Sequence, residues 1–376
     1  MIPSVRLCGH SQLELLAEKG VIEYRAIEEY GLRTEDLNWS QIVLLGRLDD
    51  WYGLRIAWRL RKTGRYVIYI LDDDLLNIPR DNSYAIHFGL KATKDNILGT
   101  LQSCHAILSP SPLLLEKYAR DGRRGMLIEE PAVNPVEYTP KEAREPVRIG
   151  FAGSIDRVQD IENLLRETLF ELRTRYRERI DIAFFGAIPS FSEALGAKCI
   201  PYCEDYFKYR DMLNDLQWDI GLAPMPETAF HAYKHYNKFC EYAAAGTVGI
   251  YSDVEPYIRA KEKYGVGIWC DNTPQAWIKS VSELIDEPWR RLSLRETLFD
   301  RVLPKLSVEK SAERLWTQLG DKRPDAVMSF GPGHLCFYKT ENFPRHVSSL
   351  FRMYGLKTPG VACRKIRERL AQKTTE

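Results

Sequence analysis

The stretch DIGLAPMPETAFHAYKHYNKFCEYAAAGTVGIYS (219–252) contains a complete strand, helix and strand in sequence. Its first apolar run, DIGLAP (219–224), and its last, TVGIYS (247–252), have the length and composition of buried strands. The segment 236–245 between them reads as a helix, and Gly246 is suited to end it. This order predicts two parallel strands joined by a helix that packs on the sheet.

The same alternation continues through the second half of the chain. Further strands are predicted at 147–153, 180–186 and 266–270, and further helices at 160–176, 205–216 and 274–286. Strands that alternate with helices in this way form a mostly parallel sheet with helices on both faces. The sequence therefore predicts a doubly wound α/β domain over 147–320.

The first half follows the same pattern and predicts a second domain of this kind over 1–135. Its strands are predicted at 5–9, 42–46, 66–71 and 105–109, and its helices at 51–63 and 92–103. Four prolines and several charges interrupt the pattern over 131–146, so 136–146 is predicted to be an interdomain linker.

The composition is that of an ordinary globular protein. The 376 residues are 44% hydrophobic and 28% charged, with a net charge of +1, which argues against disorder as the overall state. A near-neutral balance also argues against nucleic acid as the main partner. No apolar run reaches the roughly 18 residues of a membrane span, and the N-terminus lacks a secretion signal. The eight scattered cysteines show no zinc spacing, so we expect reduced thiols in a cytoplasmic protein.

Residues 321–376 form a basic tail. Its turn-rich start is followed by many arginines and lysines against few acids. We interpret this segment as a solvated helical extension that packs back on the N-terminal domain. Contact of the tail with an anionic acceptor or the inner membrane surface is the alternative.

The stretch VRIGFAGSIDRVQDIENLL (147–165) is a strand that enters a glycine turn and then a helix. Gly153 permits close approach of the backbone to a ligand. Backbone N–H groups after Ser154 would favour a phosphate, and Arg157 adds a cation. A Gly-Ser turn that only caps the helix is the alternative.

Four side chains within residues 219–252 suggest a nucleotide site. Lys234 and Lys238 are four residues apart, and Glu241 follows three residues later with Tyr242 beside it. In a helix over 236–245, Lys238 and Glu241 lie on one face. The carboxylate would accept from ribose hydroxyls, and the lysines would meet a diphosphate. A surface ion pair without a ligand is the alternative.

This stretch resembles the donor-site motif of the retaining GT-B glycosyltransferases in the family-4-like (glycosyl transferase group 1) superfamily. Within it, the chain resembles a bacterial branch with the pattern D-I-G-I-A-P-L-x-D-x-x-F-x-x-x-K-S-x-x-K-x-x-E-Y-A-A-x-G-x-P-V-x-x-S. The matching positions are Asp219, Ile220, Gly221, Ala223, Pro224, Phe230, Lys234, Lys238, Glu241, Tyr242, Ala243, Ala244, Gly246 and Ser252. RIGFAGS (148–154) resembles the family's opening strand of the second domain, and YVIYILDDDLLNIP (66–79) resembles the end of its first-domain strand that carries two aspartates. The likeness thus covers roughly residues 1–320.

The resemblance implies a GT-B fold, in which two Rossmann-like domains face a central cleft. The N-terminal domain would bind the acceptor and the C-terminal domain the nucleotide sugar. Glu241 takes the place of the second glutamate of the family's Glu-x7-Glu motif, which holds the nucleotide ribose. Tyr233 stands where the first glutamate of the motif would be. That glutamate faces the sugar ring in the family, so the sequence does not determine the identity of the transferred sugar. Two further departures are Lys234-His235 for Lys-Ser and Gly246-Thr247-Val248 for Gly-x-Pro.

Three consecutive carboxylates, Asp72, Asp73 and Asp74, follow the strand predicted at 66–71. Such a group can hold Mn²⁺ or Mg²⁺ with a diphosphate, as in GT-A enzymes with their Asp-x-Asp motif. In the GT-B interpretation, Asp72 instead faces the cleft and contacts acceptor hydroxyls or caps a turn. The GT-B class needs no metal, so we expect no metal site and no cofactor other than the donor substrate.

The predicted function is transfer of a sugar from a nucleoside diphosphate sugar to an acceptor hydroxyl, with retention and without a metal. The acceptor is a glycan, a lipid-linked sugar or a small molecule. The predicted catalytic residues are Lys234, Lys238 and Asp72. The predicted donor-binding residues are Gly153, Ser154, Arg157, Lys234, Lys238, Glu241 and Tyr242. The alternatives are a non-catalytic GT-B-like binding protein and a metal-dependent GT-A-type transferase.

Overall fold

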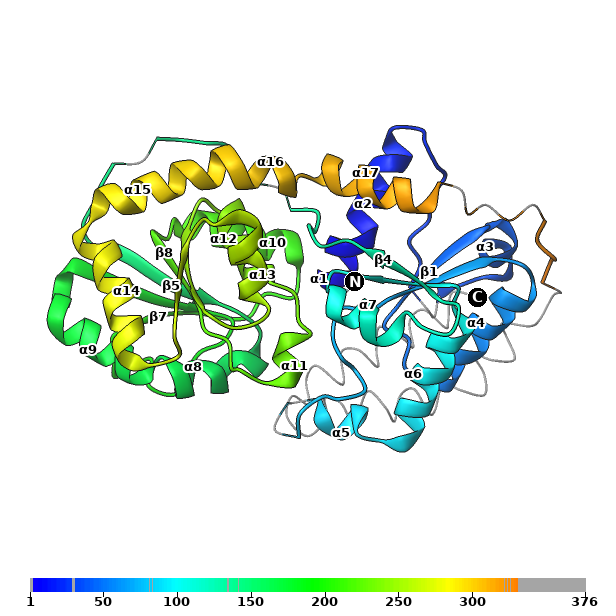
Figure 1. The fold of residues 1–376 in the computed structure, drawn as a ribbon, viewed down its shortest axis with the longest axis horizontal. Helices are drawn as coiled ribbons and strands as arrows, with labels where there is room; N and C mark the ends of the chain where they lie inside the picture. The colour runs from blue at the N-terminus through cyan, green and yellow to red at the C-terminus, as the bar shows by residue number, and fades with distance from the viewer. Residues whose placement is uncertain are drawn as a thin grey trace. The chain divides into compact units, whose positions relative to one another are not determined.

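The computed structural model describes residues 3–28, 31–80, 82, 84–133, 135–140, 142–320, 322, 324 and 326–330. The chain divides into two compact units (Figure 1). The first comprises Met1–Glu129 and Ala312–Glu376, and the second comprises Glu130–Ser311. The sequence predicts a second domain that runs to residue 320, whereas the structure assigns the chain from Ala312 onward to the first unit.

The first unit is built on a four-stranded parallel sheet in the order β1-β2-β3-β4. The strands are β1 (Ile42–Gly46), β2 (Tyr66–Ile70), β3 (Ala106–Ser109) and β4 (Arg124–Leu127). Its helices are α1 (Pro3–Val5), η1 (Arg6–His10), α2 (Ser11–Glu18), α3 (Thr34–Trp39), α4 (Trp51–Lys62), α5 (Ala85–Phe88), α6 (Lys91–Ser103), α7 (Pro112–Tyr118) and, after the second unit, α17 (Val308–Leu319).

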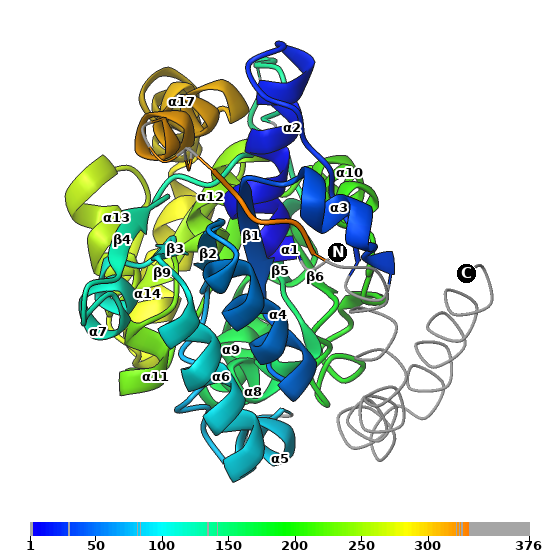
Figure 2. The same ribbon diagram turned by 90° about the vertical axis from the view of Figure 1, so that its right-hand side faces the viewer.

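Helices cover both faces of this sheet. Figure 2 shows α2 and α17 on one side and α4 and α6 on the other. On the first side, Ile68 and Ile70 of β2 pack in one apolar cluster with Leu13 of α2 and Leu315 of α17. From Ala312 onward, α17 belongs to the first unit because its apolar residues complete this core.

The predicted strand at 5–9 is wrong, because the structure forms η1 there, continuous with α2. Leu7 and Cys8 are buried, so the apolar run reflects burial and carries no strand period. A helix satisfies its backbone polar groups internally, which a buried segment without a partner strand requires. The other predicted strands are confirmed, and the two missed strands, β4 and β7, are short edge strands with charged or polar residues.

The described part of the tail packs on the first unit. The Met328 N–H donates to the Thr63 carbonyl at 2.9 Å, and Arg65 donates to the Met328 carbonyl at 2.8 Å. Asn38 exchanges hydrogen bonds with the backbone of Phe330. The predicted basic helix of the tail lies outside the described residues.

The second unit is built on a six-stranded parallel sheet in the order β10-β9-β8-β5-β6-β7. The strands are β5 (Val147–Ala152), β6 (Ile180–Phe185), β7 (Lys198–Ile200), β8 (Ile220–Ala223), β9 (Val248–Ser252) and β10 (Ile268–Cys270). The helices are η3 (Ile155–Arg157), α8 (Val158–Leu164), α9 (Arg166–Tyr176), η4 (Arg177–Arg179), α10 (Tyr206–Leu216), α11 (Ala229–Ala232), α12 (Asn237–Ala244), α13 (Tyr257–Tyr264), α14 (Pro274–Asp286), α15 (Pro288–Thr297), η5 (Leu298–Val302) and α16 (Leu303–Leu306).

The strand order is that of a doubly wound Rossmann sheet. The chain starts at β5 in the middle, adds β6 and β7 on one side, and then crosses to add β8, β9 and β10 on the other. Figure 1 shows α8 and α9 on one side of the sheet and α12 and α13 on the other. Gly246 ends α12 as predicted, with a φ of 65° that suits glycine.

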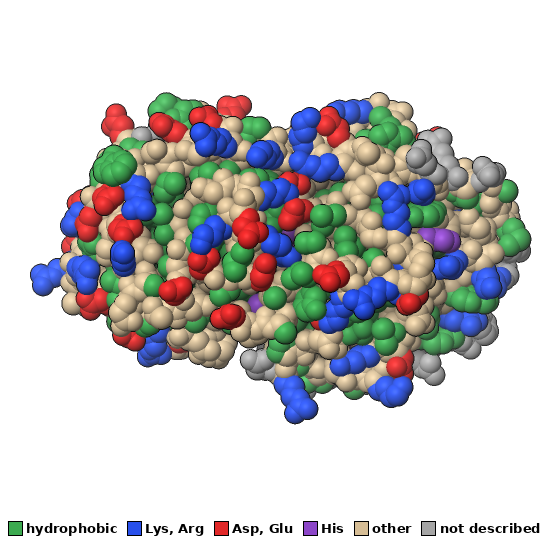
Figure 3. Space-filling view, in the orientation of Figure 1, with side chains coloured by type: hydrophobic (Ala, Val, Ile, Leu, Met, Phe, Trp, Pro, Cys, Tyr) green, Lys and Arg blue, Asp and Glu red, His purple; other side chains and the backbone are tan. Residues whose placement is uncertain are grey.

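Two surface properties bear on function. No helix in the described parts of the chain is long and apolar enough to cross a membrane. On the face shown in Figure 3, acidic and basic side chains are interspersed over the second unit.

Candidate functional site

The candidate site lies at the carboxyl edge of the six-stranded sheet, where β5 and β8 are neighbours. The chain runs from β5 to β6 on one side and from β8 to β9 on the other, so the loops after β5 and β8 leave the sheet in opposite directions at its topological switch point. The loop after β5 begins with Gly153, and the loop after β8 begins with Pro224. In open α/β sheets, ligands bind at this switch point.

The glycine turn after β5 is tightly packed. The Gly153 N–H donates to the Phe185 carbonyl at 2.9 Å, and a Cβ on Gly186 would lie 2.2 Å from the Gly153 carbonyl oxygen. Gly186 also has a φ of 82°, so glycine is required there. Ser154 makes no side-chain hydrogen bond to the helical turn that follows. A capping role of the Ser154 hydroxyl is therefore absent in this structure.

Arg157 connects the two loops of the switch point. Its Nη2 donates to the Pro224 carbonyl at 2.6 Å, and its Nε lies 2.5 Å from Oδ2 of Asp160. The two atoms of the second contact are close but not aligned for a hydrogen bond, so the contact is an ion pair. Burial raises the pKa of Asp160, and the charge of Arg157 opposes this. Arg157 therefore acts on the protein's own groups in this structure.

The loop after β8 brings a histidine and a lysine to the same place. Nδ1 of His231 lies 2.7 Å from the Thr228 hydroxyl, and its Nε2 lies 4.0 Å from Asp160. Burial, followed by the charges of Arg157 and Lys234, lowers the pKa of His231 to about 3. The imidazole is therefore neutral at pH 7. The Lys234 N–H donates to the His231 carbonyl at 3.0 Å, and the His231 ring lies beside Asp160, the partner of Arg157, so the three residues belong to one cluster.

Lys238 and Glu241 form a compact triangle with Tyr209 of α10. Nζ of Lys238 donates to Oε2 of Glu241 at 2.5 Å and to the Tyr209 hydroxyl at 3.2 Å. The Tyr209 hydroxyl donates to the same Oε2 at 2.7 Å. Lys238 and Glu241 thus lie on one face of α12, as the sequence predicts, and they form an i,i+3 ion pair with each other, which was the alternative interpretation. A tyrosine from another helix joins the pair.

The two clusters have a common neighbour. The buried Tyr257 has its pKa raised by burial, and the charges of both Arg157 and Glu241 act on it. Lys238 lies in the first turn of α12, which begins at the carboxyl edge because it follows β8. Three cations, Arg157, Lys234 and Lys238, and two carboxylates, Asp160 and Glu241, therefore lie at this edge of the sheet.

Tyr242 lies beneath the site and does not line it. Its side chain is fully buried, and its hydroxyl donates to the Leu222 carbonyl at 2.8 Å and accepts from the Ala152 N–H at 3.3 Å. Gly221 makes room for the ring, because a Cβ there would lie 2.6 Å from it. Tyr242 joins the ends of β5 and β8 and supports the loops that carry the site.

The three consecutive aspartates, Asp72, Asp73 and Asp74, are divided between two basic partners. Arg47 donates two hydrogen bonds to Asp72, at 2.9 and 2.6 Å, and one to Asp73 at 3.1 Å. Asp74 is buried and pairs with Lys117 at 2.7 Å. Within the described residues, no group of three or more His, Cys, Asp or Glu side chains is placed to hold a metal ion.

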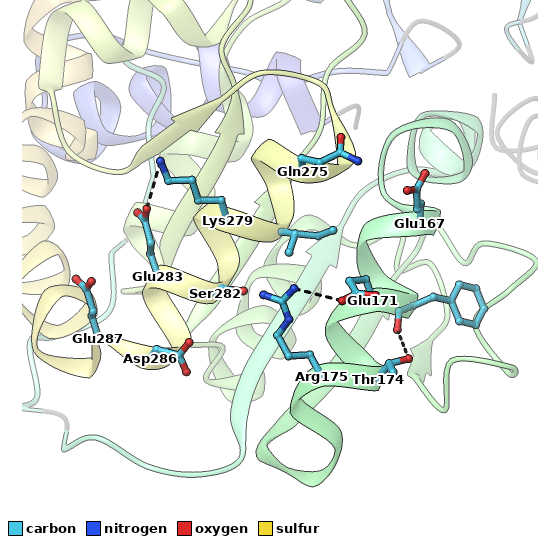
Figure 4. Close-up of a pocket in the computed structure, with 12 residues that line it drawn as sticks. Glu167, Glu171, Thr174, Arg175, Gln275, Lys279, Ser282, Glu283, Asp286 and Glu287 are labelled. Atoms are coloured by element: carbon cyan, nitrogen blue, oxygen red, sulfur yellow. Dashed lines mark hydrogen bonds and ion pairs between the residues drawn. The ribbon is translucent and has the colours of Figure 1, made fainter.

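An open groove of about 850 Å³ lies elsewhere on the second unit, between α9 and α14 (Figure 4). Its two basic side chains already pair with its own acids, Arg175 with Glu171 at 3.2 Å and Lys279 with Glu283 at 4.0 Å. Further carboxylates line it, including Asp286. A diphosphate would be repelled there, so this groove is not the candidate site.

Sequence reasoning missed three residues of the site: Tyr209, Asp160 and His231. Tyr209 is 32 residues before Glu241, and nothing in its spacing relates the two. Asp160 could have been found from its position three residues after Arg157, since residues at this spacing pair on a helix. His231 follows the capping residue Thr228 by three positions, which predicts a helix start and no electrostatic role.

No family model and no curated protein matches this chain. Among solved structures, the chain is similar to the pneumococcal O-GlcNAc transferase GtfA, in complex with UDP and GlcNAc, with a TM-score of 0.52 and 12% identity. That match covers 77% of this chain and 58% of the other. It is also similar to an E. coli trehalose-6-phosphate protein bound with UDP-2-fluoro glucose (14% identity, 78% and 76% covered, TM-score 0.48). A third similar structure is sucrose-phosphate synthase from Thermosynechococcus elongatus, with 13% identity, 74% of each chain covered and a TM-score of 0.48.

At these identities the likeness to GtfA concerns the fold alone. It identifies the fold as GT-B, with two α/β units that are each built on a parallel sheet, as the sequence predicts.

Proposed function

We propose that this chain is a glycosyltransferase that transfers a sugar from a nucleoside diphosphate sugar to an acceptor hydroxyl. The observation that carries the proposal is the gathering of Arg157, Lys234, Lys238 and Glu241 at the switch point of the second sheet. A diphosphate carries the opposite charge to the three cations, and ribose supplies the donors that a carboxylate accepts. The GT-B fold of the chain agrees with this proposal.

The proposed chemistry is electrostatic. When the bond between sugar and diphosphate breaks, negative charge grows on the leaving oxygen. Ammonium groups placed beside that oxygen stabilise the transition state more than the ground state. Lys234 and Lys238 take this role in the proposal. Arg157 holds the loops after β5 and β8 at the Gly153–Ser154 turn, where backbone N–H groups meet the phosphates.

The finer parts of the proposal rest on the resemblance in the sequence. These are retention of configuration, independence of metal and a place in the bacterial family-4-like branch. A cytoplasmic location is proposed from the scattered cysteines. We also propose Asp72 as a contact for the acceptor, although its pairing with Arg47 means that an acceptor hydroxyl would share the carboxylate. Peripheral membrane contact through the basic tail remains a proposal from composition.

The metal-dependent alternative gains no support from Asp72, Asp73 and Asp74. Asp74 is engaged with Lys117, apart from the other two, which Arg47 binds. The GT-A type also has a different fold from the GT-B fold of this chain. The non-catalytic alternative predicts binding of the same nucleotide without turnover, so it is decided by the assay below.

The test begins with thermal unfolding in the presence of UDP-, GDP-, dTDP- and ADP-sugars, because a ligand that binds the folded state raises its melting temperature. The donor that binds is then incubated with the protein in excess EDTA, and release of the nucleoside diphosphate is followed by chromatography. We expect release, and we expect Lys234→Ala to reduce it. Lys279→Ala is the matched control, since this lysine of α14 has a 78% exposed side chain.

Absence of any thermal shift with all four donors would contradict the proposed function. Binding without release or transfer would favour the non-catalytic alternative. Loss of release in EDTA, restored by Mn²⁺ or Mg²⁺, would contradict independence of metal only.

A further inference from the structure

The geometry around Glu241 raises the question of what holds its carboxylate in place. Lys238, its neighbour one helical turn away, has a long side chain with many rotamers. An ion pair of this kind tolerates several carboxylate orientations. Recognition of a ribose requires one orientation, because the hydroxyl groups of a bound sugar lie at fixed positions.

Tyr209 supplies a rigid contact from a different element. Its ring lies 5.0 Å from the ring of Phe185, centroid to centroid, and Phe185 is the last residue of β6. Asp205 caps the start of α10 by accepting from the Lys208 N–H at 2.8 Å, which fixes the turn that carries Tyr209. The tyrosine hydroxyl is therefore anchored to the carboxyl edge of the sheet.

The hydroxyl group is a permanent donor. Burial, followed by the charge of Glu241, raises the pKa of Tyr209 well above 10, so the hydroxyl keeps its proton throughout the physiological range. It donates to Oε2 of Glu241, the oxygen that Lys238 also contacts. Within the described part of the chain, no hydrogen bond reaches Oε1 of Glu241. Oε2 is thus held by two donors from the protein, and Oε1 keeps its accepting capacity for a ligand.

We infer that Tyr209 is a positioning residue that orients the Glu241 carboxylate for the ribose hydroxyls of the nucleotide, and so sets the preference for ribose over a sugar lacking those hydroxyls. This inference rests on the proposed function. It assigns Tyr209 no contact with the reacting atoms. Its effect on the ligand passes through Glu241.

The test compares each ribonucleoside diphosphate (UDP, GDP and ADP) with its 2′,3′-dideoxy counterpart by calorimetry on the full chain. The wild-type protein is expected to bind the cognate ribonucleotide at least about tenfold more tightly than the dideoxy form, as one charge-assisted hydrogen bond provides. Tyr209→Phe keeps the ring against Phe185 and removes the hydroxyl. We expect this preference to fall at least about threefold, with affinity for the dideoxy form changed less than about twofold.

Tyr176→Phe is the matched control. The Tyr176 hydroxyl donates to Asp286 at 2.6 Å, so the substitution removes the same kind of contact between tyrosine and carboxylate. Both residues lie at the C-terminal ends of their helices, α9 and α14, at the opposite edge of the sheet. The preference for ribose is expected to be unchanged in this variant.

A second comparison separates positioning from general support of the fold. In a Glu241→Gln background, adding Tyr209→Phe should leave the preference for ribose unchanged, because the carboxylate that Tyr209 orients is absent. A structural role would lower affinity for both nucleotides in both backgrounds. The comparison of Glu241→Gln with the double variant also tests the inference if Tyr209→Phe alone does not fold, because neither protein contains a buried carboxylate that has lost a donor.

The outcomes are distinct. If the wild-type protein binds none of UDP, GDP, ADP and dTDP, the proposed function fails. If the wild-type protein prefers the ribonucleotide and Tyr209→Phe retains that preference, the inference is overturned while the proposed function stands. A further fall in preference on adding Tyr209→Phe to Glu241→Gln also overturns it.

Discussion

Replacement of Arg157 by methionine is expected to destabilise the second unit strongly, because this side chain joins the two loops of the switch point. Methionine has a similar length and no charge. The variant loses the hydrogen bond to the Pro224 carbonyl and the ion pair with Asp160. The Asp160 carboxylate then remains in a largely buried position without its cation.

The magnitude follows from the burial of the pair. Breaking a buried ion pair by removing one partner costs about 3–5 kcal/mol. The side chains of Arg157 and Asp160 are 14% and 12% exposed, so some solvent reaches them. We therefore expect a loss near the lower limit, about 3 kcal/mol. For a unit of this size, that corresponds to a fall in melting temperature of roughly 6–12 °C.

The assay is differential scanning calorimetry of the full chain, with a double-mutant cycle. Asp160→Leu removes the carboxylate, and the double variant Arg157→Met, Asp160→Leu removes both charges. Replacement of a buried pair by apolar residues is often close to neutral, so the double variant should recover much of the stability lost by Arg157→Met. The loss in Arg157→Met should also shrink toward acid pH, where Asp160 takes up a proton and its burial costs less.

Two results would refute this reasoning. The first is a loss below about 1 kcal/mol for Arg157→Met, which is the range of an exposed ion pair. The second is additivity of the two substitutions, since a pair that interacts must show coupling.

Three further predictions concern Glu241, Lys238 and His231. Glu241→Ala should weaken nucleotide binding by roughly 1–3 kcal/mol, since the ribose hydroxyls lose their acceptor. An unchanged affinity in calorimetry would show that Glu241 does not bind the ribose. Lys238→Ala should lower kcat more than ground-state affinity if Nζ stabilises the leaving diphosphate, whereas equal losses would indicate ordinary binding. Stability should fall as the pH drops from about 6.5 to about 3, because the unfolded chain protonates His231 and the folded chain does not. His231→Gln should remove this contribution to the pH dependence of the free energy of unfolding, which is at most about 1.4 kcal/mol per pH unit. If urea unfolding gives the same dependence on pH for the variant and the wild-type protein, the prediction is contradicted.

The order of strands and helices was accessible from the sequence, since it depends on local patterns. Apolar runs of strand length alternate with amphipathic segments throughout the second unit, and the structure forms strands and helices there. The run at 5–9 shows the limit of this reasoning. A short, wholly buried apolar segment has no period that separates helix from strand, so only the available partners decide.

In the candidate site, too, local sequence patterns predicted some features and only the folded chain showed the others. The sequence placed Lys238 and Glu241 on one helical face, and the structure brings their charged groups to 2.5 Å. It also placed Gly153 at the turn after a central strand. It did not distinguish a residue that lines the site from one that supports it. Tyr242 follows Glu241 directly and yet points beneath the sheet edge, because adjacent helical positions differ by about 100° around the axis.

The sequence by itself determined which residues are neighbours within a single helix or turn, because backbone geometry fixes those distances. The tertiary structure alone decided which distant groups meet. It brought Tyr209 of α10 to Glu241 of α12, directed Arg157 to the Pro224 carbonyl, and returned α17 to the first unit. These contacts depend on how helices and loops pack on the two sheets, and packing is a property of the whole chain that no local spacing contains.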